Sequence, residues 1–387
     1  MVRSFRDLET KVVRAGQPSP RIEGAVVMPL FQSAMFESLG QTSYHDLKYI
    51  RLNNTPTQVA LHAKLAAIEN AESALATASG MAAIATTLLT VLAPGDRLLA
   101  QDCVYGGTHD LLTGELAALG IATDFIDADD PDSWERLLRP TTRAIYVESL
   151  TNPLLQVGDL EAVVRFAQSH GLVSIIDNTF ATPVNFRPLE RGFDLALHSC
   201  TKYLNGHSDI VAGAVIGTAA WIKRITHRLN HLGGSLDPHA CFLLDRGLKT
   251  LVLRVRYQNQ SALQIAHRLE QHSAVSRVHY AGLPSHLRHE RAGRLFEGFS
   301  GMISFELSGG AAAADRFMER TTLPVVAPSL GGPETLLTRP AVTSHAGMSA
   351  DERRKAGISD GLIRMSVGLE STGEIIDDLV QALDDSR

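Results

Sequence analysis

The sequence contains few cysteines and few aromatic residues, and both shortages narrow the classes of protein to which it can belong. Three cysteines occur among its 387 residues, at Cys103, Cys200 and Cys241, with spacings that fit neither a disulfide framework nor a CxxC motif. We expect them to be buried thiols in a reducing cytoplasm. Aromatic residues make up 6% and the net charge is −6, so the chain lacks the stacking and basic surfaces of nucleic-acid-binding proteins.

Long hydrophobic runs are also missing. The most apolar stretch, Met81–Ala93, is too short to cross a bilayer and contains threonines, so it predicts a buried helix. The first sixteen residues contain early charges and no apolar core, unlike a secretory signal. We therefore expect a cytoplasmic protein with no membrane and no nucleic-acid partner. Hydrophobic residues at 44% and charged residues at 20% are typical of a globular protein, and the length suggests two or three domains.

Three regions can be separated along the chain. Residues 1–57 show no sustained hydrophobic period, and we interpret them as an N-terminal arm. Residues 58–240 begin with a helical pattern at Gln58–Glu72 and continue as alternating strand-like and helical segments. Residues 241–387 form a smaller C-terminal region.

The middle region predicts a mostly parallel α/β sheet. Short apolar runs alternate with helical candidates such as Leu160–His170, which Gly171 closes. In such sheets ligands bind beyond the carboxyl ends of the strands. The runs are Arg97–Ala100, Thr123–Ile126, Ala144–Val147, Val173–Ile176, Leu195–Leu197 and Ala212–Ile216.

The C-terminal region predicts a smaller α+β unit. Ala240–Gln271 reads as one long helix or two joined ones, with Gly247 as the interruption. Met302–Glu306 and Leu362–Val367 are strand candidates, and Thr372–Leu383 is the expected closing helix.

Three residues stand where the predicted sheet would place chemistry. Asp177 directly follows the run Val173–Ile176, and Lys202 follows Leu195–Leu197 after a short Ser-Cys-Thr segment. Gly80 opens the Met81 helix. Taken singly, such residues are more often a turn carboxylate, a surface lysine and an ordinary helix start. Together they meet the needs of pyridoxal phosphate (PLP): an amine for the imine, a carboxylate for the pyridine nitrogen and a helix N-terminus for the phosphate.

Several ordered segments strengthen this interpretation, and on them the chain resembles the Cys/Met-metabolism PLP enzymes, also called the cystathionine γ-synthase family. The most specific is SCTKYLNGHSD at Ser199–Asp209, which looks like the family's cofactor-lysine signature. The resemblance covers nearly the whole chain and implies a fold type I, aminotransferase-like large domain. The other segments are Tyr49–Arg51, Ala78–Ile84, Asp102–Thr108, Glu148–Pro153, Ile175–Phe180, Ser329–Leu336 and Leu362–Glu370.

The resemblance also implies roles for individual residues. Lys202 would hold the cofactor as a Schiff base, and Asp177 would pair with the pyridine nitrogen. Tyr105 would stack on the cofactor ring and protonate the leaving group. The implied phosphate ligands are Gly80, Met81, Ser199 and Thr201, with Tyr49 and Arg51 reaching a neighbouring subunit; Asn152, Ser329 and Arg364 would bind the substrate carboxylate or orient the cofactor. One departure is Thr55, which is added in the loop after Arg51.

The sequence indicates the type of reaction less clearly than it indicates the cofactor. Methionine γ-lyases typically have cysteine where this chain has Gly107, and enteric β-lyases have tryptophan at Leu330. Cystathionine γ-lyases tend to have glutamate at Thr338 and an acidic residue at Lys48. Thr338 and the run Thr343–Ser359 resemble γ-synthases. We therefore favour cystathionine γ-synthase or γ-lyase chemistry on a small amino-acid substrate, with β-lyase or methionine γ-lyase chemistry as the alternative.

Other classes of function stay open. A PLP-binding homologue without turnover, or an aminotransferase of similar fold, would share the same cofactor residues. His227 and His231 are four residues apart, but no carboxylate cluster adjoins them, so we predict no metal site. The resemblance further implies a homo-oligomer, expected as a tetramer built from two dimers.

Overall fold

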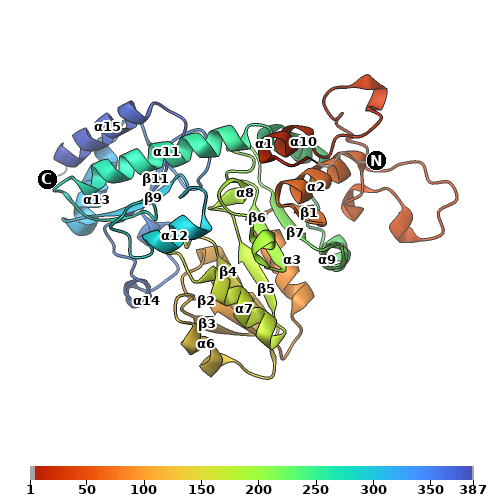
Figure 1. The fold of residues 1–387 in the computed structure, drawn as a ribbon, viewed down its shortest axis with the longest axis horizontal. Coiled ribbons are helices and arrows are strands. Elements are labelled where there is room, and N and C mark those ends of the chain that lie inside the picture. Colours follow the sequence, from red (N-terminus) through yellow and green to blue (C-terminus); the bar gives the residue numbers. More distant parts are fainter. Residues whose placement is uncertain (1–4, 386–387) are drawn as a thin grey trace.

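A seven-stranded sheet forms the centre of the protein (Figure 1). The computed structural model describes residues 5–385, and the sheet has the order β1-β7-β6-β5-β4-β2-β3. Every pairing within the run β6-β5-β4-β2-β3 is parallel, and β7 pairs antiparallel with both β1 and β6. The mostly parallel sheet is thereby confirmed. Its strands are β1 (Ser73–Thr77), β2 (Arg97–Gln101), β3 (Ala122–Ile126), β4 (Thr142–Glu148), β5 (Val173–Asp177), β6 (Leu195–Ser199) and β7 (Gly213–Gly217).

Helices cover both faces of this sheet. Successive residues along a strand point to opposite faces, so Ile145 packs in one core cluster and Tyr146 in the other. Burial on both faces explains why the strands read as continuous apolar runs. One face is covered by α1 (Leu8–Arg14), α2 (Pro56–Ile68), α6 (Pro131–Leu137), α7 (Leu160–His170), α8 (Thr182–Asn185) and α10 (Pro238–Leu248), and the other by α3 (Gly80–Val91), α9 (Ala219–Leu232) and the segment α4 (Gly106–Asp110), η4 (Leu111–Glu115), α5 (Leu116–Ala118).

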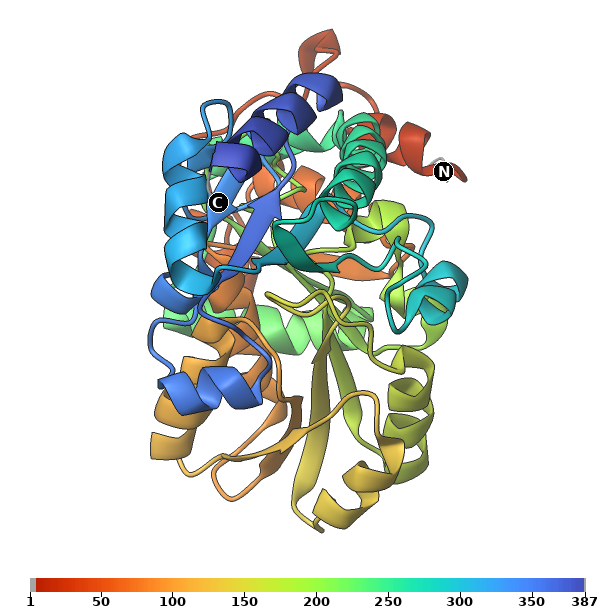
Figure 2. The same cartoon turned by 90° about the vertical axis from the view of Figure 1, so that its left-hand side faces the viewer.

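The C-terminal region contains a second, five-stranded sheet of order β10-β11-β12-β9-β8, antiparallel except for the pair β10–β11. Viewed from the side, it lies with α11 and α15 above the strands of the large sheet (Figure 2). The strands are β8 (Val275–His279), β9 (Met302–Leu307), β10 (Val325–Val326), β11 (Leu336–Thr338) and β12 (Leu362–Ser366); the helices are α11 (Leu251–Glu270), α12 (His289–Leu295), α13 (Gly310–Arg320), α14 (Ala350–Lys355) and α15 (Thr372–Asp385).

The helical stretch expected at Ala240–Gln271 is two helices, α10 and α11, but Gly247 is not the break. Gly247 lies inside α10, and the chain interrupts the helix at Lys249 and Thr250. A Cβ at Gly247 would lie 2.2 Å from the carbonyl oxygen of Asn205. The glycine therefore permits a close approach to the segment that follows Lys202, rather than marking a helix end.

The arm ends where α2 begins, and Thr55 is the N-cap of that helix. Its side chain and that of Gln58 form a capping box, in which the Thr55 N–H donates to Oε1 of Gln58 over 3.2 Å. The added residue thus starts α2, two residues before the predicted position. The arm itself contains η1 (Ile22–Gly24), η2 (Tyr44–Asp46) and η3 (Ile50–Leu52); η5 (Pro188–Arg191) and η6 (Pro340–Val342) lie further along the chain. The limits proposed for the three regions stay a prediction.

Within residues 5–385, no helix combines the length and apolar composition needed to cross a membrane. In the same range, no group of three or more His, Cys, Asp or Glu side chains could hold a metal ion. The rings of His227 and His231 meet edge to face, with ring centroids 4.7 Å apart. All three cysteines are buried free thiols, and burial raises the pKa of each.

Candidate active site

Three neighbouring parallel strands end in polar residues at the same edge of the large sheet. β4 ends at Glu148, β5 at Asp177 and β6 at Ser199, and Glu148 lies opposite Asp177 in the register of the sheet. The carboxyl ends of parallel strands therefore converge at this edge, which is where a ligand site is expected. Lys202 follows three residues after the end of β6.

Asp177 is a partly accessible carboxylate at the end of β5. Its Oδ1 accepts the Thr179 N–H over 2.9 Å, and the Thr179 hydroxyl accepts the Ser199 N–H over 2.8 Å, which ties the ends of β5 and β6 together. Burial raises the pKa of Asp177, against the lowering effect of the hydrogen bonds from Thr179. A carboxylate that is costly to ionise in this place would be stabilised by a cationic N–H partner.

The N-terminus of α3 lies at the same edge of the large sheet and has the backbone donors of an anion-binding turn. Ser79 caps the helix and accepts the Ala82 N–H, while the N–H groups of Gly80 and Met81 have no acceptor within a helix of this geometry. A Cβ at Gly80 would lie 2.8 Å from Cβ of Ser199. Only glycine therefore lets the helix start approach Ser199 this closely, and it leaves backbone donors beside a serine hydroxyl.

The Lys202 amine lies in a partly buried position and donates to the Ser329 hydroxyl over 2.7 Å. Burial, and then the nearby Arg364 guanidinium, lower the pKa of Lys202 to about 8. The hydroxyl of Thr201 is hydrogen-bonded to both backbone groups of Ala212, which fixes the loop between β6 and β7 around the lysine. The amine is thus a base that can lose its proton near neutral pH.

Arg364 lies on β12, a central strand of the small sheet, and its guanidinium is buried. It donates to Oδ1 of Asn152 over 2.9 Å and to the carbonyl oxygen of Ser329 over 3.2 Å. Desolvation lowers the pKa of Arg364 to about 10, so the group stays cationic at neutral pH. A buried guanidinium with planar donors is suited to binding a carboxylate.

The Ser329 loop is shaped to meet Lys202. Ser329 has φ of 90° and Gly331 has φ of 73°, and the Gly331 N–H donates to the Ser366 hydroxyl on β12. A Cβ at Gly331 would lie 2.7 Å from the backbone nitrogen of Tyr203. Positive φ and close contact with the lysine segment together require glycine at position 331.

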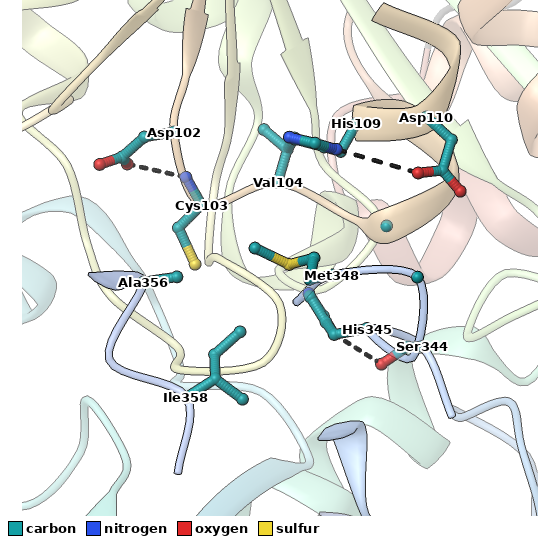
Figure 3. Close-up of a pocket in the computed structure, with 12 residues that line it drawn as sticks. Asp102, Cys103, Val104, His109, Asp110, Ser344, His345, Met348, Ala356 and Ile358 are labelled. Atoms are coloured by element: carbon teal, nitrogen blue, oxygen red, sulfur yellow. Dashed lines mark hydrogen bonds and ion pairs between the residues drawn. The ribbon is translucent and has the colours of Figure 1, made fainter. Parts of the chain in front are cut away.

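Tyr105 lies at the turn before α4, with its side chain 42% exposed and thus free to face a ligand. The loop around Ser344 packs against this turn, since a Cβ at Gly106 would lie 2.1 Å from the Ser344 carbonyl oxygen. Between them is a cavity of about 30 Å³, into which Cys103 and Met348 point (Figure 3). A space of this size can hold water but is too small for a cofactor or an amino acid, so it belongs to the wall of the site.

Tyr49 and Arg51 lie away from the Lys202 site of their own chain, and the role predicted for them in the site of a neighbouring chain stays a prediction. In this chain Arg51 donates to the carbonyl oxygen of Asn230 in α9 over 2.9 Å and to the Tyr44 hydroxyl. The guanidinium also lies 5.5 Å from the ring centroid of Tyr49. The arm extends away from the body of the molecule (Figure 1), and none of these contacts involves the Lys202 site of the same chain.

Glu148 is a site residue that the sequence analysis passed over. Its carboxylate accepts the N–H of Tyr105 over 2.7 Å and that of Asn152 over 3.3 Å. The sequence did contain a signal for Glu148, because an acidic residue at the end of a buried apolar strand is unusual. Its partners, however, are brought together only by the fold.

These residues fit PLP on several independent counts. Lys202 offers an amine of lowered pKa and Asp177 a carboxylate short of a cationic partner. The Gly80 turn leaves a cradle of N–H donors suited to a phosphate. Arg364 adds a cation for a substrate carboxylate.

Comparison with known proteins agrees with this geometry. Cystathionine β-lyase of Coxiella burnetii is 39% identical over 97% of both chains, and cystathionine γ-lyase of Bacillus subtilis is 40% identical over 97% of this chain and 99% of its own. L-methionine γ-lyase of Pseudomonas deceptionensis is 40% identical over 97% and 96%. The crystal structure of cystathionine γ-lyase from Lactobacillus plantarum complexed with L-serine has a TM-score of 0.93 at 35% identity, covering 98% of this chain and 99% of that one.

The comparisons confirm the fold type I interpretation and the PLP cofactor. The sequence model of the family described as Cys/Met metabolism PLP-dependent enzyme matches residues 9–384. With a site that fits the cofactor and relatives that are lyases of sulfur amino acids, the chain belongs to the Cys/Met metabolism PLP-dependent enzyme family.

Proposed function

We propose that the protein is a cystathionine γ-lyase, which breaks the bond between Cγ and sulfur of L-cystathionine. With one water molecule consumed, the products are cysteine, 2-oxobutanoate and ammonia. The observation that supports this proposal most is the hydrogen-bonded chain from the Lys202 amine through Ser329 to Arg364. It sets a base beside a carboxylate-binding cation, which is the arrangement that an α-amino acid requires.

The roles of the site residues form part of the proposal. Lys202 would hold the cofactor covalently, and Asp177 would keep a proton on its ring nitrogen. Tyr105 would face the ring and the leaving group. The phosphate would be bound by Gly80, Met81, Ser199 and Thr201, and the substrate carboxylate by Asn152, Ser329 and Arg364.

When bound, PLP supplies an electron sink for the electrons left at Cα. The protein's own residues move the protons. The Lys202 amine takes the Cα proton, a second proton leaves Cβ, and the Tyr105 hydroxyl gives a proton to the departing sulfur. Arg364 fixes the carboxylate so that Cα faces Lys202 throughout, which reduces the entropy lost at each step.

Elimination at Cβ is the second candidate, because the Coxiella burnetii relative is named a cystathionine β-lyase. The test is incubation with L-cystathionine and mass spectrometry of the products. 2-Oxobutanoate with cysteine supports the proposal, whereas pyruvate with homocysteine replaces it by β-elimination. If cystathionine is not consumed, an activated homoserine ester with cysteine tests the transferase reaction of a γ-synthase, and cystathionine formation would establish it.

The rate of turnover is expected to rise with pH. Burial lowers the pKa of Lys202 to about 8, and the amine accepts the Cα proton only in its neutral form. We therefore expect kcat to increase from about pH 6.5 and to level off above about pH 9, as for a general base.

The measurement is a series of initial rates at saturating substrate across this range. Enzyme held at each pH and then returned to pH 8 for assay controls for loss of folded protein. A kcat that is constant or falls over the same interval contradicts a Lys202 base with this pKa.

We also propose that the active unit is a homo-oligomer in which the arm completes the site of a neighbouring chain. This is supported by exposed apolar side chains along the arm, including Val26, Met35 and Leu39. A dimer of dimers, the cytoplasmic location and the three-region division of the chain belong to the same proposal.

Mixing two inactive variants is expected to restore part of the activity. Arg51→Ala removes a phosphate ligand given to the partner, and Lys202→Ala removes the base of its own site. In a mixed dimer, one of the two sites has both residues intact.

The measurement is turnover after subunit exchange, which native mass spectrometry of differently tagged chains verifies. Each variant treated alone in the same way is the control. If the subunits exchange but the mixture stays inactive, Arg51 does not serve the site of a neighbouring chain.

A further inference from the structure

Glu148 occupies a place that a neutral residue would fill at lower cost. It is 5% exposed at the end of β4, and Asp177 lies opposite it on β5. Burial, and then the charge of Asp177, raise the pKa of Glu148 well above its usual range. A buried carboxyl group beside a second carboxyl group destabilises the fold unless it has specific partners.

The partners of Glu148 are two backbone N–H groups that come from different segments of the site. One oxygen accepts the Tyr105 N–H, at the start of α4, and the other accepts the Asn152 N–H, in the loop after β4. The Glu148 N–H itself donates to Oε1 of Gln101 at the end of β2, over 2.9 Å. A single side chain thus bridges two loops, and a third strand holds its backbone.

These two loops bear groups with different tasks. Asn152 accepts a hydrogen bond from Arg364, which in turn contacts Ser329, the partner of the Lys202 amine. Tyr105 lies on the other side of Glu148. These hydrogen bonds form one continuous path from the turn of Tyr105 to the amine of Lys202. Within this path Glu148 joins the two loops, beside a longer contact of 3.9 Å from the Cys103 thiol to the Asn152 carbonyl oxygen.

We propose that Glu148 is a positioning residue that fixes the Tyr105 turn against the Asn152 loop. In this way Tyr105, which would face the leaving group, and Asn152, which contacts Arg364, keep a fixed position relative to each other. The inference rests on the proposed function of this site, which it deepens by adding a residue that touches neither substrate nor cofactor.

The test replaces Glu148 by glutamine, which has the same size but only one acceptor oxygen. Its NH2 group would face one of the two N–H donors, so one loop must shift. We expect the dissociation constant for glycine, an amino acid without a leaving group, to rise about tenfold, as for a lost buried hydrogen bond. The absorbance of the bound cofactor reports glycine binding without any turnover, and borohydride trapping reports the cofactor content.

A double-mutant cycle separates positioning from general destabilisation. If Glu148 acts on the clamp through Asn152, Glu148→Gln should weaken glycine binding much less in an Asn152→Ala background. Additive effects, or unchanged glycine binding in Glu148→Gln, would overturn the inference. If Glu148→Gln does not fold, Glu148→Asp is used in the same cycle, since it keeps the charge but is too short to reach both loops.

Glu306→Gln is the matched control. Glu306 is a partly buried carboxylate that pairs with His279 over 2.9 Å in the small sheet and contacts none of the site residues. We expect it to lower the thermal midpoint without changing the glycine constant. If the wild-type protein itself neither traps cofactor nor responds to glycine, the proposed function fails, which is a different result from failure of Glu148→Gln alone.

Discussion

Replacing Lys202 by alanine is expected to abolish both covalent attachment of the cofactor and turnover. The Lys202 amine is the group beside Ser329 and Arg364 that can form an imine and accept a proton at neutral pH. Losing a nucleophile and a general base together should lower kcat/KM by at least about 10³-fold. Intact-mass measurement after borohydride reduction should show one bound cofactor per wild-type chain and none on the variant.

Lys223→Ala is the control for this substitution. Lys223 lies on the exposed face of α9, so its removal changes the charge of the protein equally without touching the site. Cofactor trapped at the same level in Lys202→Ala would mean that another lysine holds it, and the assignment of the active site would be wrong.

Replacing Arg364 by lysine is expected to weaken substrate binding strongly while the cofactor stays bound. Lysine keeps the charge but cannot contact Asn152 and Ser329 at once with a planar pair of donors. Losing a hydrogen bond to a charged group in a buried site costs about 1.5–3 kcal/mol, or roughly 10- to 150-fold in kcat/KM. We expect most of this loss in KM, because the clamp acts on the bound substrate before the chemistry.

The measurement is the steady-state KM and kcat of Arg364→Lys, with Arg97→Lys as the matched control. Arg97 also makes a two-bond contact, with Asp124, but it begins β2 at the opposite end of the sheet. The Arg97 variant should keep wild-type KM. If both variants behave alike, or if Arg364→Lys has an unchanged KM, the carboxylate is bound elsewhere.

Much of the large sheet was predictable because its inner strands are buried on both faces. The runs at β2 to β7 agree with the structure within a residue or two at each end, and the helix Leu160–His170 agrees at both ends, with Gly171 at φ of 63° as its cap. The strand β1, Ser-Ala-Leu-Ala-Thr, was missed because its small side chains give no strand pattern. β8 was missed because it lies at a sheet edge with mixed exposure.

The prediction that two chains share a site differs from the prediction of the fold, because it concerns contacts between chains. Arg51 was assigned to a neighbouring subunit by resemblance, and its contacts with Asn230 and Tyr44 are those of one chain. Whether the guanidinium reaches a phosphate depends on how two chains associate, and mixing of the variants decides that question.

The sequence by itself determined the family, the cofactor and the positions of most strands of the large sheet along the chain, since these follow from local runs and motifs such as Ser199–Asp209. Only the tertiary structure decided which groups are neighbours. Arg364 lies 212 residues from Asn152, and Ser329 lies 127 residues from Lys202, yet each pair is hydrogen-bonded. The bridging role of Glu148 arose in the same way, because a carboxylate finds its partners only when the strand ends and loops of a folded sheet meet, and no local pattern encodes that meeting.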